Sequence, residues 1–208
     1  MTSLTRIVLD PHNAAAKADL THVNSLHKTL MRLVPDNSGP TPRAKARLLF
    51  RAEPGPDPTL LVQTAHTPNL TALPTNYGTT RTLDLTPLLN SLTPGRTMRY
   101  RITAAPTATR SAGSPTRHPI TGKRRGKITH LTGDDAIAWW QRRAEAAGLE
   151  PVTVSSLPRP FPRTPHGTLT QFDGFARITD TGLLTHALEN GIGRAKTYGA
   201  GLLSLAPA

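Results

Sequence analysis

The chain has 208 residues, with 25 lysines and arginines against 13 aspartates and glutamates, and a formal net charge of +12. It contains no cysteine, which excludes disulfides and thiolate metal sites. No apolar run approaches the roughly 18 residues of a membrane span, and the N-terminus lacks the apolar core of a signal peptide, so we expect a cytoplasmic protein without membrane contact.

The first half of the chain has a clear order of predicted elements. They are a strand at residues 4–10, a helix at 21–34, strands at 46–53 and 59–66, a helical turn at 69–74 and a strand at 79–86. The helix is the best defined of them because its apolar residues recur at helical spacing. These are Val23, Leu26, Leu30, Leu33 and Val34.

The second half repeats this order after a boundary at residues 91–95. Its predicted elements are a strand at 96–104, a helix at 134–148, strands at 149–157 and 167–179, a helix at 181–190 and a strand at 201–206. Each half therefore reads βαββαβ. This order predicts an α+β protein of two tandem ferredoxin-like, RRM-like domains, residues 1–93 and 94–208.

The same sheet serves RNA-recognition motifs, but the aromatic signature with which those stack bases is missing here. The whole chain has four Phe, three Tyr and two Trp. Stacking on single-stranded bases is therefore disfavoured as the main binding mode, and charge against a folded RNA backbone is favoured.

Positive charge is concentrated in one stretch. No acidic residue occurs between Asp84 and Asp134, and 19 of the 25 cations in the chain are arginines, which suit phosphate recognition. We interpret residues 109–127 as a long loop whose cations follow the phosphates of an A-form stem. Its candidate RNA-binding residues are Arg110, Arg117, Lys123, Arg124, Arg125 and Lys127. The alternative explanations of the positive charge are a ribosome-like basic surface and the amino-acid composition that a GC-rich genome produces. For the loop, the alternative is a charged segment without a specific role.

The segment "GIGRAKTYGAGLLSLAP", residues 191–207, suggests a phosphate loop by its glycines and lysine. A P-loop needs glycine directly before its lysine, and here Ala195 precedes Lys196; the dinucleotide fingerprint fails at the same lysine. Both motifs lead from a strand into a helix, whereas this segment leads from a helix into a strand. It is therefore not a nucleotide-binding loop.

This segment, together with "VNSLHKTL", "RYRITAAPTATR" and "DDAIAWWQRR", resembles the CasE family. These are the repeat-RNA endoribonucleases of type I-E CRISPR systems and subunits of the Cascade complex. The resemblance covers nearly the whole chain and implies two ferredoxin-like domains. It also implies cleavage at the base of the CRISPR repeat hairpin without a metal or other cofactor. The implied partners are the repeat RNA hairpin and other Cascade subunits, and we expect a monomer in isolation.

The resemblance also implies the catalytic residues. It places the catalytic histidine at His27, on the flank of the apolar stripe. An imidazole can accept the 2′-hydroxyl proton or donate one to the leaving 5′-oxygen at neutral pH. Some members have a tyrosine three residues earlier, where this chain has Asn24, and a cation five residues later, matching Arg32. Asparagine can orient a phosphate but cannot exchange a proton. The eight histidines show no metal-ligand spacing, so we expect no metal site.

Two further regions are implied to contact RNA. The glycine-rich segment would lie beside the bound RNA with Gly191, Gly193, Arg194 and Lys196, and a hairpin would bring Arg159 and Arg163 to the stem. The alternative for the glycines is that they serve left-handed turns between a helix and a strand. For the chain as a whole, a non-catalytic subunit that binds structured RNA is the alternative that Asn24 leaves open. Recognition of double-stranded DNA is disfavoured because no recognition-helix motif occurs.

Overall fold

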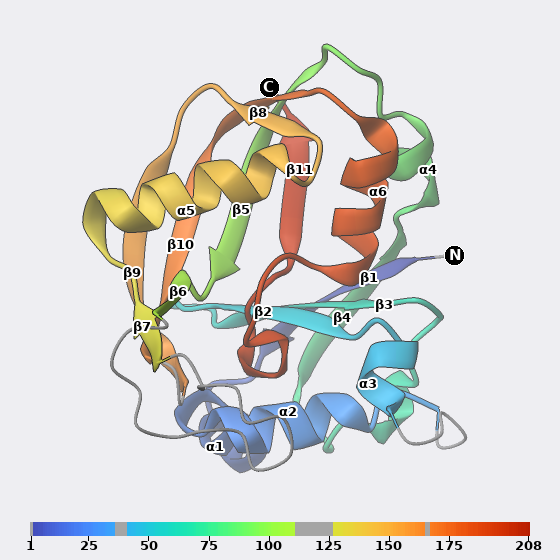
Figure 1. The fold of residues 1–208 in the computed structure, drawn as a ribbon. Helices are drawn as coiled ribbons and strands as arrows, with labels where there is room; N and C mark the ends of the chain where they lie inside the picture. Colours follow the sequence, from blue (N-terminus) through green and yellow to red (C-terminus); the bar gives the residue numbers. More distant parts are fainter. Residues whose placement is uncertain (1, 36–40, 111–126, 165–166) are drawn as a thin grey trace, which may run out of the picture.

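A computed structural model of the chain describes residues 2–35, 41–110, 127–164 and 167–208. Its strands form two main antiparallel sheets, each with helices packed on one face (Figure 1). Both sheets have the strand order of a ferredoxin-like unit, with the first strand of each unit in the interior of the sheet. The predicted α+β fold class of two ferredoxin-like units is confirmed.

The first sheet has the order β2-β3-β1-β4. Its strands are β1 (Ser3–Leu9), β2 (Leu49–Glu53), β3 (Thr59–Thr64) and β4 (Gly78–Asp84). One face is covered by α1 (Ala14–Thr21), α2 (Val23–Met31) and the short α3 (Pro42–Lys45) and η1 (Leu70–Ala72). Leu26 and Leu30 of α2 are fully buried against Ile7 and Leu60 of the sheet, so the predicted apolar stripe does face the core.

The single helix predicted at residues 21–34 is wrong in extent. The chain has two helices here, divided at His22, whose backbone is extended with φ −125° and ψ 105°. The side chain of Asn13 caps α1 by accepting a hydrogen bond from the backbone N–H of Ala16 at 3.1 Å. Only Ala16 and Asp19 of α1 are buried, so this helix has no apolar stripe from which periodicity could reveal it.

The second sheet has the order β11-β5-β10-β8, and β9 also pairs with β10. Its strands are β5 (Thr97–Ala104), β8 (Leu149–Pro151), β9 (Ser155–Thr164), β10 (Gly167–Ile178) and β11 (Leu203–Pro207). The helices α5 (Gly133–Glu145) and α6 (Thr181–Asn190) cover one face. The short η2 (Lys196–Tyr198) lies between α6 and β11.

Several short elements differ from the prediction. The strand expected at 149–157 is divided into β8 and β9, because the N–H groups of Val152 and Thr153 both donate to the carbonyl of Phe175 and interrupt the regular pairing. The helices α3 and α4 (Thr86–Asn90) and the strands β6 (Thr107–Arg110) and β7 (Lys127–His130) were not predicted. The strands β6 and β7 pair in a small sheet of their own.

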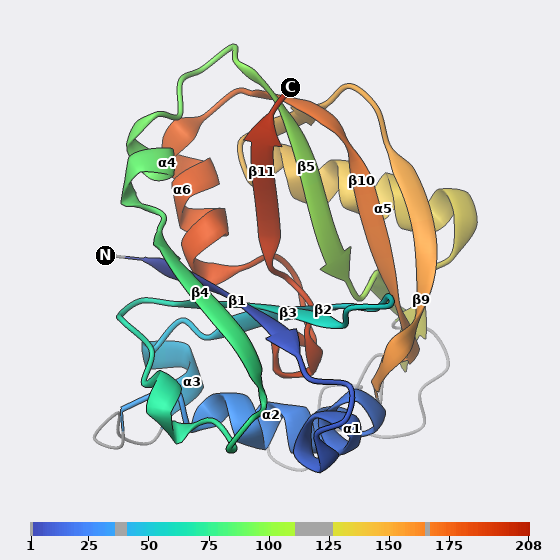
Figure 2. The same cartoon turned by 180° about the vertical axis from the view of Figure 1, so that it is seen from behind.

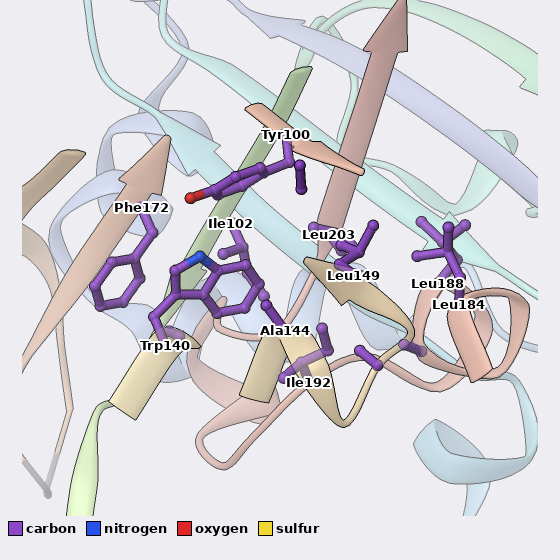
Figure 3. Packing of buried hydrophobic residues seen from close by; sticks show 14 of the residues in the cluster. Tyr100, Ile102, Trp140, Ala144, Leu149, Phe172, Leu184, Leu188, Ile192 and Leu203 are labelled. Carbon is purple, nitrogen blue, oxygen red and sulfur yellow. The ribbon is translucent and has the colours of Figure 1, made fainter. Parts of the chain in front are cut away.

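The second core is built by alternation along β5. Met98, Tyr100 and Ile102 point inward and are at most 1% exposed. Trp140 of α5 packs flat against Phe172 of β10, with ring centroids 5.7 Å apart, and both are fully buried (Figure 3). Each buried side chain of this size contributes about 1.5–3 kcal/mol relative to exposure. This core therefore fixes the position of the sheet whose other face meets the first unit.

Buried polar side chains of the first sheet join the two units by donating to backbone carbonyls of the second. Gln63 of β3 is 1% exposed, and its Nε2 donates to the carbonyl of Leu188 at 2.7 Å. Arg51 of β2 is 3% exposed, and its Nη1 donates to the carbonyl of Leu202 at 3.1 Å. From behind, the strands of the first sheet are seen to cross below those of the second (Figure 2). The loop that holds η2 thereby passes β2 and reaches α2 (Figure 1).

Candidate active site

The helix α2 positions His27 at the edge of the first core. Its neighbours Leu26 and Leu30 are fully buried and Thr29 is 7% exposed, whereas the side chain of His27 is half-buried. The imidazole therefore has one edge in the protein and one towards the surface. Its Nδ1 atom is buried and has no hydrogen-bond partner among the described residues, which leaves Nε2 for a substrate.

The electrostatic setting favours the neutral form of this histidine. Burial of the ring is the main cause that lowers the pKa of His27, and the positive charge of Arg43 lowers it further. The ordinary value is near 6.5, so the lowered pKa leaves the imidazole neutral at pH 7. A neutral imidazole can accept a proton, so this setting favours the base role of His27 over the acid role.

Arg43 was missed by sequence reasoning. It lies in α3, is half-buried, and its Nη1 donates to the carbonyl of Leu48 at 3.1 Å. Burial lowers the pKa of the Arg43 guanidinium, which stays charged at neutral pH because arginine starts from so high a value. It occurs in the basic segment "PRAKAR", where no spacing separates it from neighbouring surface cations, so the sequence held no signal for it.

Lys196 reaches the same place from the second unit. It begins η2, is half-buried, and its Nζ donates to the carbonyl of Asn190 at 2.7 Å. Burial and then the charge of Arg43 lower the pKa of Lys196. Since α2 contacts η2 and Arg43 acts on both other groups, the fold gathers three basic side chains from three elements.

The glycines of the C-terminal segment shape this loop. Gly191 ends α6 with φ +72°, and a Cβ there would meet the side chain of Leu49 and, at 3.0 Å, the carbonyl of Gly201. Gly193 has φ +82°, and a Cβ there would lie 3.3 Å from the Trp139 ring. Both backbones therefore face protein atoms, which favours the turn-forming alternative for these glycines. Arg194 between them and Lys196 is exposed.

Asn24 and Arg32 lie on either side of His27 along the helix. Asn24 is exposed one turn earlier, and Arg32 is exposed at the C-cap of α2. On an ideal helix Arg32 points about 140° away from His27. No contact between described residues joins either of them to the imidazole.

The candidate RNA-binding residues of the second unit fall into two groups. Arg110 and Lys127 are register partners at the open end of the β6–β7 pair, and Arg163 lies opposite Thr168 near the tip of the β9–β10 hairpin. Arg117, Lys123, Arg124 and Arg125 lie outside the described residues. The predicted hairpin is thus present.

Arg159 contacts the protein itself. Its side chain is 11% exposed, its Nη2 donates to the carbonyl of Ala52 at 3.2 Å, and it lies 3.7 Å from the Glu53 carboxylate. Glu53 also pairs with Arg51 at 2.7 Å and Arg101 at 3.8 Å. Nearby, a cavity of about 680 Å³ lies on the second unit, lined mainly by its residues, among them Arg101, and by Arg51 of the first sheet. Arg159 is therefore part of a polar network between the units.

Within residues 2–35, 41–110, 127–164 and 167–208, no three His, Asp or Glu side chains gather in a set that could hold a metal ion. No helix in the same ranges is long and apolar enough to cross a membrane.

Comparison with known proteins gives matches over nearly the whole chain. A family described as CRISPR associated protein matches residues 3–207. CRISPR-associated endoribonuclease Cse3 of Thermus thermophilus is 30% identical over 225 residues, which cover 98% of this chain and 99% of the relative. CRISPR system Cascade subunit CasE of Escherichia coli is 30% identical over 200 residues, covering 92% and 96%. A solved structure of CRISPR endoribonuclease Cse3 bound to a 19-nucleotide RNA superposes with a TM-score of 0.81 at 29% identity and covers all of both chains.

Proposed function

The chain belongs to the family of CRISPR-associated proteins, and from this premise we propose that it cuts precursor CRISPR RNA at the base of the repeat hairpin and stays bound to the product within Cascade. It is an endoribonuclease, as its full-length relationship to Cse3 and CasE supports. Its partners are the repeat RNA and other Cascade subunits. Because the proposed substrate is an RNA transcript, we infer that the protein acts in the cytoplasm.

The proposed mechanism depends on the position of His27 and on its neutral form. The neutral imidazole, whose Nδ1 atom is buried, accepts at Nε2 the proton of the 2′-hydroxyl next to the scissile phosphate. The 2′-oxygen then attacks phosphorus, the bond between phosphorus and the 5′-oxygen breaks, and the 5′-oxygen leaves with a proton from water. The products are a 2′,3′-cyclic phosphate and a 5′-hydroxyl. The nucleophile belongs to the RNA, so DNA is not cut.

In this proposal the first unit provides the catalytic residues and the second unit binds the RNA stem. Residues 1–93 form the unit with His27, Asn24 and Arg32 on or at the end of α2. Residues 94–208 supply the basic surface for the stem, with the β6–β7 pair, the β9–β10 hairpin and the glycine-rich segment. A folded stem suits this surface because phosphates, which carry the negative charge, run along its outside.

The test uses a labelled repeat hairpin and purified protein in EDTA. We expect one cut at the base of the stem, with a 2′,3′-cyclic phosphate on the upstream fragment. A matched hairpin with a 2′-deoxynucleotide at the scissile position should bind as tightly and stay intact. Tight binding of the all-RNA hairpin without any cut would instead support the alternative, a non-catalytic assembly subunit.

A further inference from the structure

Positive charge near His27 has no acidic partner among the described residues, and the proposed proton transfer does not require this charge. Two cations here are half-buried: Arg43 acts electrostatically on the imidazole and on Lys196, and η2, which Lys196 begins, contacts α2. No described residue forms an ion pair with either of them. Half-buried like charges repel one another and lose hydration, so such an arrangement is unfavourable unless an anion joins it.

Arginines that follow Arg43 closely in the sequence do form ion pairs with acidic residues. Arg47, four residues after Arg43, pairs with Glu189 at 2.6 Å, and Arg51 pairs with Glu53 at 2.7 Å. Arg43 instead uses one donor on the carbonyl of Leu48. A guanidinium has five N–H donors in a planar fork, and the contact with Leu48 fixes its direction while the others stay available for a phosphate.

Lys196 is held in the same manner. One of its three donors goes to the carbonyl of Asn190, which lies directly before Gly191. Gly191 in turn packs against Leu49, the residue after the carbonyl that anchors Arg43. The anchors of both cations thus lie where the two units touch, and each cation is fixed by the backbone before any ligand binds.

We propose that Arg43 and Lys196 form the subsite that binds the scissile phosphodiester beside His27, and that Arg43 is a further catalytic residue of the cleavage. This inference rests on the proposed function. In the reaction the 2′-oxygen bonds to phosphorus while the bond to the 5′-oxygen breaks, and His27 takes the 2′-hydroxyl proton. Negative charge on the non-bridging oxygens rises in the pentacoordinate transition state. Two fixed cations stabilise that state more than the ground state.

The experiment compares three variants at saturating protein in EDTA, measuring single-turnover cleavage of the repeat hairpin. Arg43→Met removes the charge, Arg43→Lys keeps it without the fork, and Lys45→Met changes an exposed cation of the same short helix. We expect Arg43→Met to cut at least about 100-fold more slowly, Arg43→Lys to lie between it and the native protein, and Lys45→Met to cut normally. Affinity for the 2′-deoxy hairpin should change only a few-fold, since the stem supplies most phosphate contacts.

The outcomes separate this inference from the proposed function. If the native protein cuts the hairpin and Arg43→Met cuts it equally fast, the subsite is refuted and the nuclease function stands. If the native protein leaves the hairpin intact, both fail. If Arg43→Met does not fold, as judged by circular dichroism, Arg43→Lys decides: a rate equal to that of the native protein would refute a role for the guanidinium fork, and a slower rate with unchanged binding would support it.

Discussion

Arg51 links the two units most directly, so its replacement gives a sharp test of how they are held together. Its Nε donates to the Glu53 carboxylate at 2.7 Å, and its Nη1 donates to the carbonyls of Arg101 at 3.2 Å and Leu202 at 3.1 Å. The residue is 3% exposed. Arg51→Met would keep an unbranched, although shorter, side chain while removing its charge and all three contacts.

The expected loss follows from these contacts. Breaking a buried ion pair by removing one partner costs about 3–5 kcal/mol, and each buried carbonyl that loses its donor costs about 1–3 kcal/mol. Glu53 keeps two weaker partners, Arg101 at 3.8 Å and Arg159 at 3.7 Å, so its carboxylate is not left alone. The methionine fills most of the space, so little cavity cost is added. We therefore expect the free energy of unfolding to fall by about 3–5 kcal/mol.

The assay is urea unfolding followed by circular dichroism, with the midpoint and slope compared between variants. The matched control is Arg177→Met, because the pair of Arg177 with Glu150 at 3.7 Å is exposed, with both side chains 57% accessible. Such a pair is worth at most about 1 kcal/mol. If Arg51→Met were no more destabilising than Arg177→Met, the polar network would not hold the units together.

Four further predictions concern RNA binding and pH. If about six phosphates are neutralised, the slope of log K for the hairpin against log salt should be steeper than about −2, and a flat dependence would contradict an electrostatic interface. Alanine at all four of Lys123, Arg124, Arg125 and Lys127 should weaken hairpin binding in a filter assay and leave the thermal unfolding midpoint unchanged; unchanged affinity would place the footprint elsewhere. A base must be neutral to act, so the cleavage rate should fall as pH drops through the lowered pKa of His27. Arg43→Met removes one cause of that lowering, so this acid limb should move to higher pH, and an unmoved limb would show that the two groups do not interact.

The elements that alternation or helical spacing reveals were predictable. The inward residues Met98, Tyr100 and Ile102 alternate along β5, and Leu26 and Leu30 recur one turn apart on α2. Helix α1 was not predictable by the same means, because it packs through Ala16 and buries Asp19, which accepts a hydrogen bond from Tyr77 at 2.7 Å. Only tertiary structure supplies that partner.

Candidate site residues could be proposed from the sequence only where a local motif points to them. His27 and Lys196 are candidates because each belongs to a short recognisable segment, and α2 and η2 come together only through the packing of the two units. Arg43 is distinguished from other arginines by what lies around it, namely a backbone carbonyl and two basic neighbours. Arg159 was predicted to contact RNA from its place in a basic hairpin, and no sequence pattern indicates that its guanidinium also reaches Ala52 and Glu53.

We propose that His27 performs the proton transfer of a hairpin-cutting ribonuclease. The most direct test is the single-turnover rate of His27→Ala on the repeat hairpin in EDTA, beside His186→Ala, which changes an exposed histidine of α6. We predict that His27→Ala cuts at least about 100-fold more slowly than the native protein, with hairpin affinity retained and His186→Ala unaffected. A His27→Ala variant that cuts at nearly the native rate would show that His27 does not perform the proton transfer.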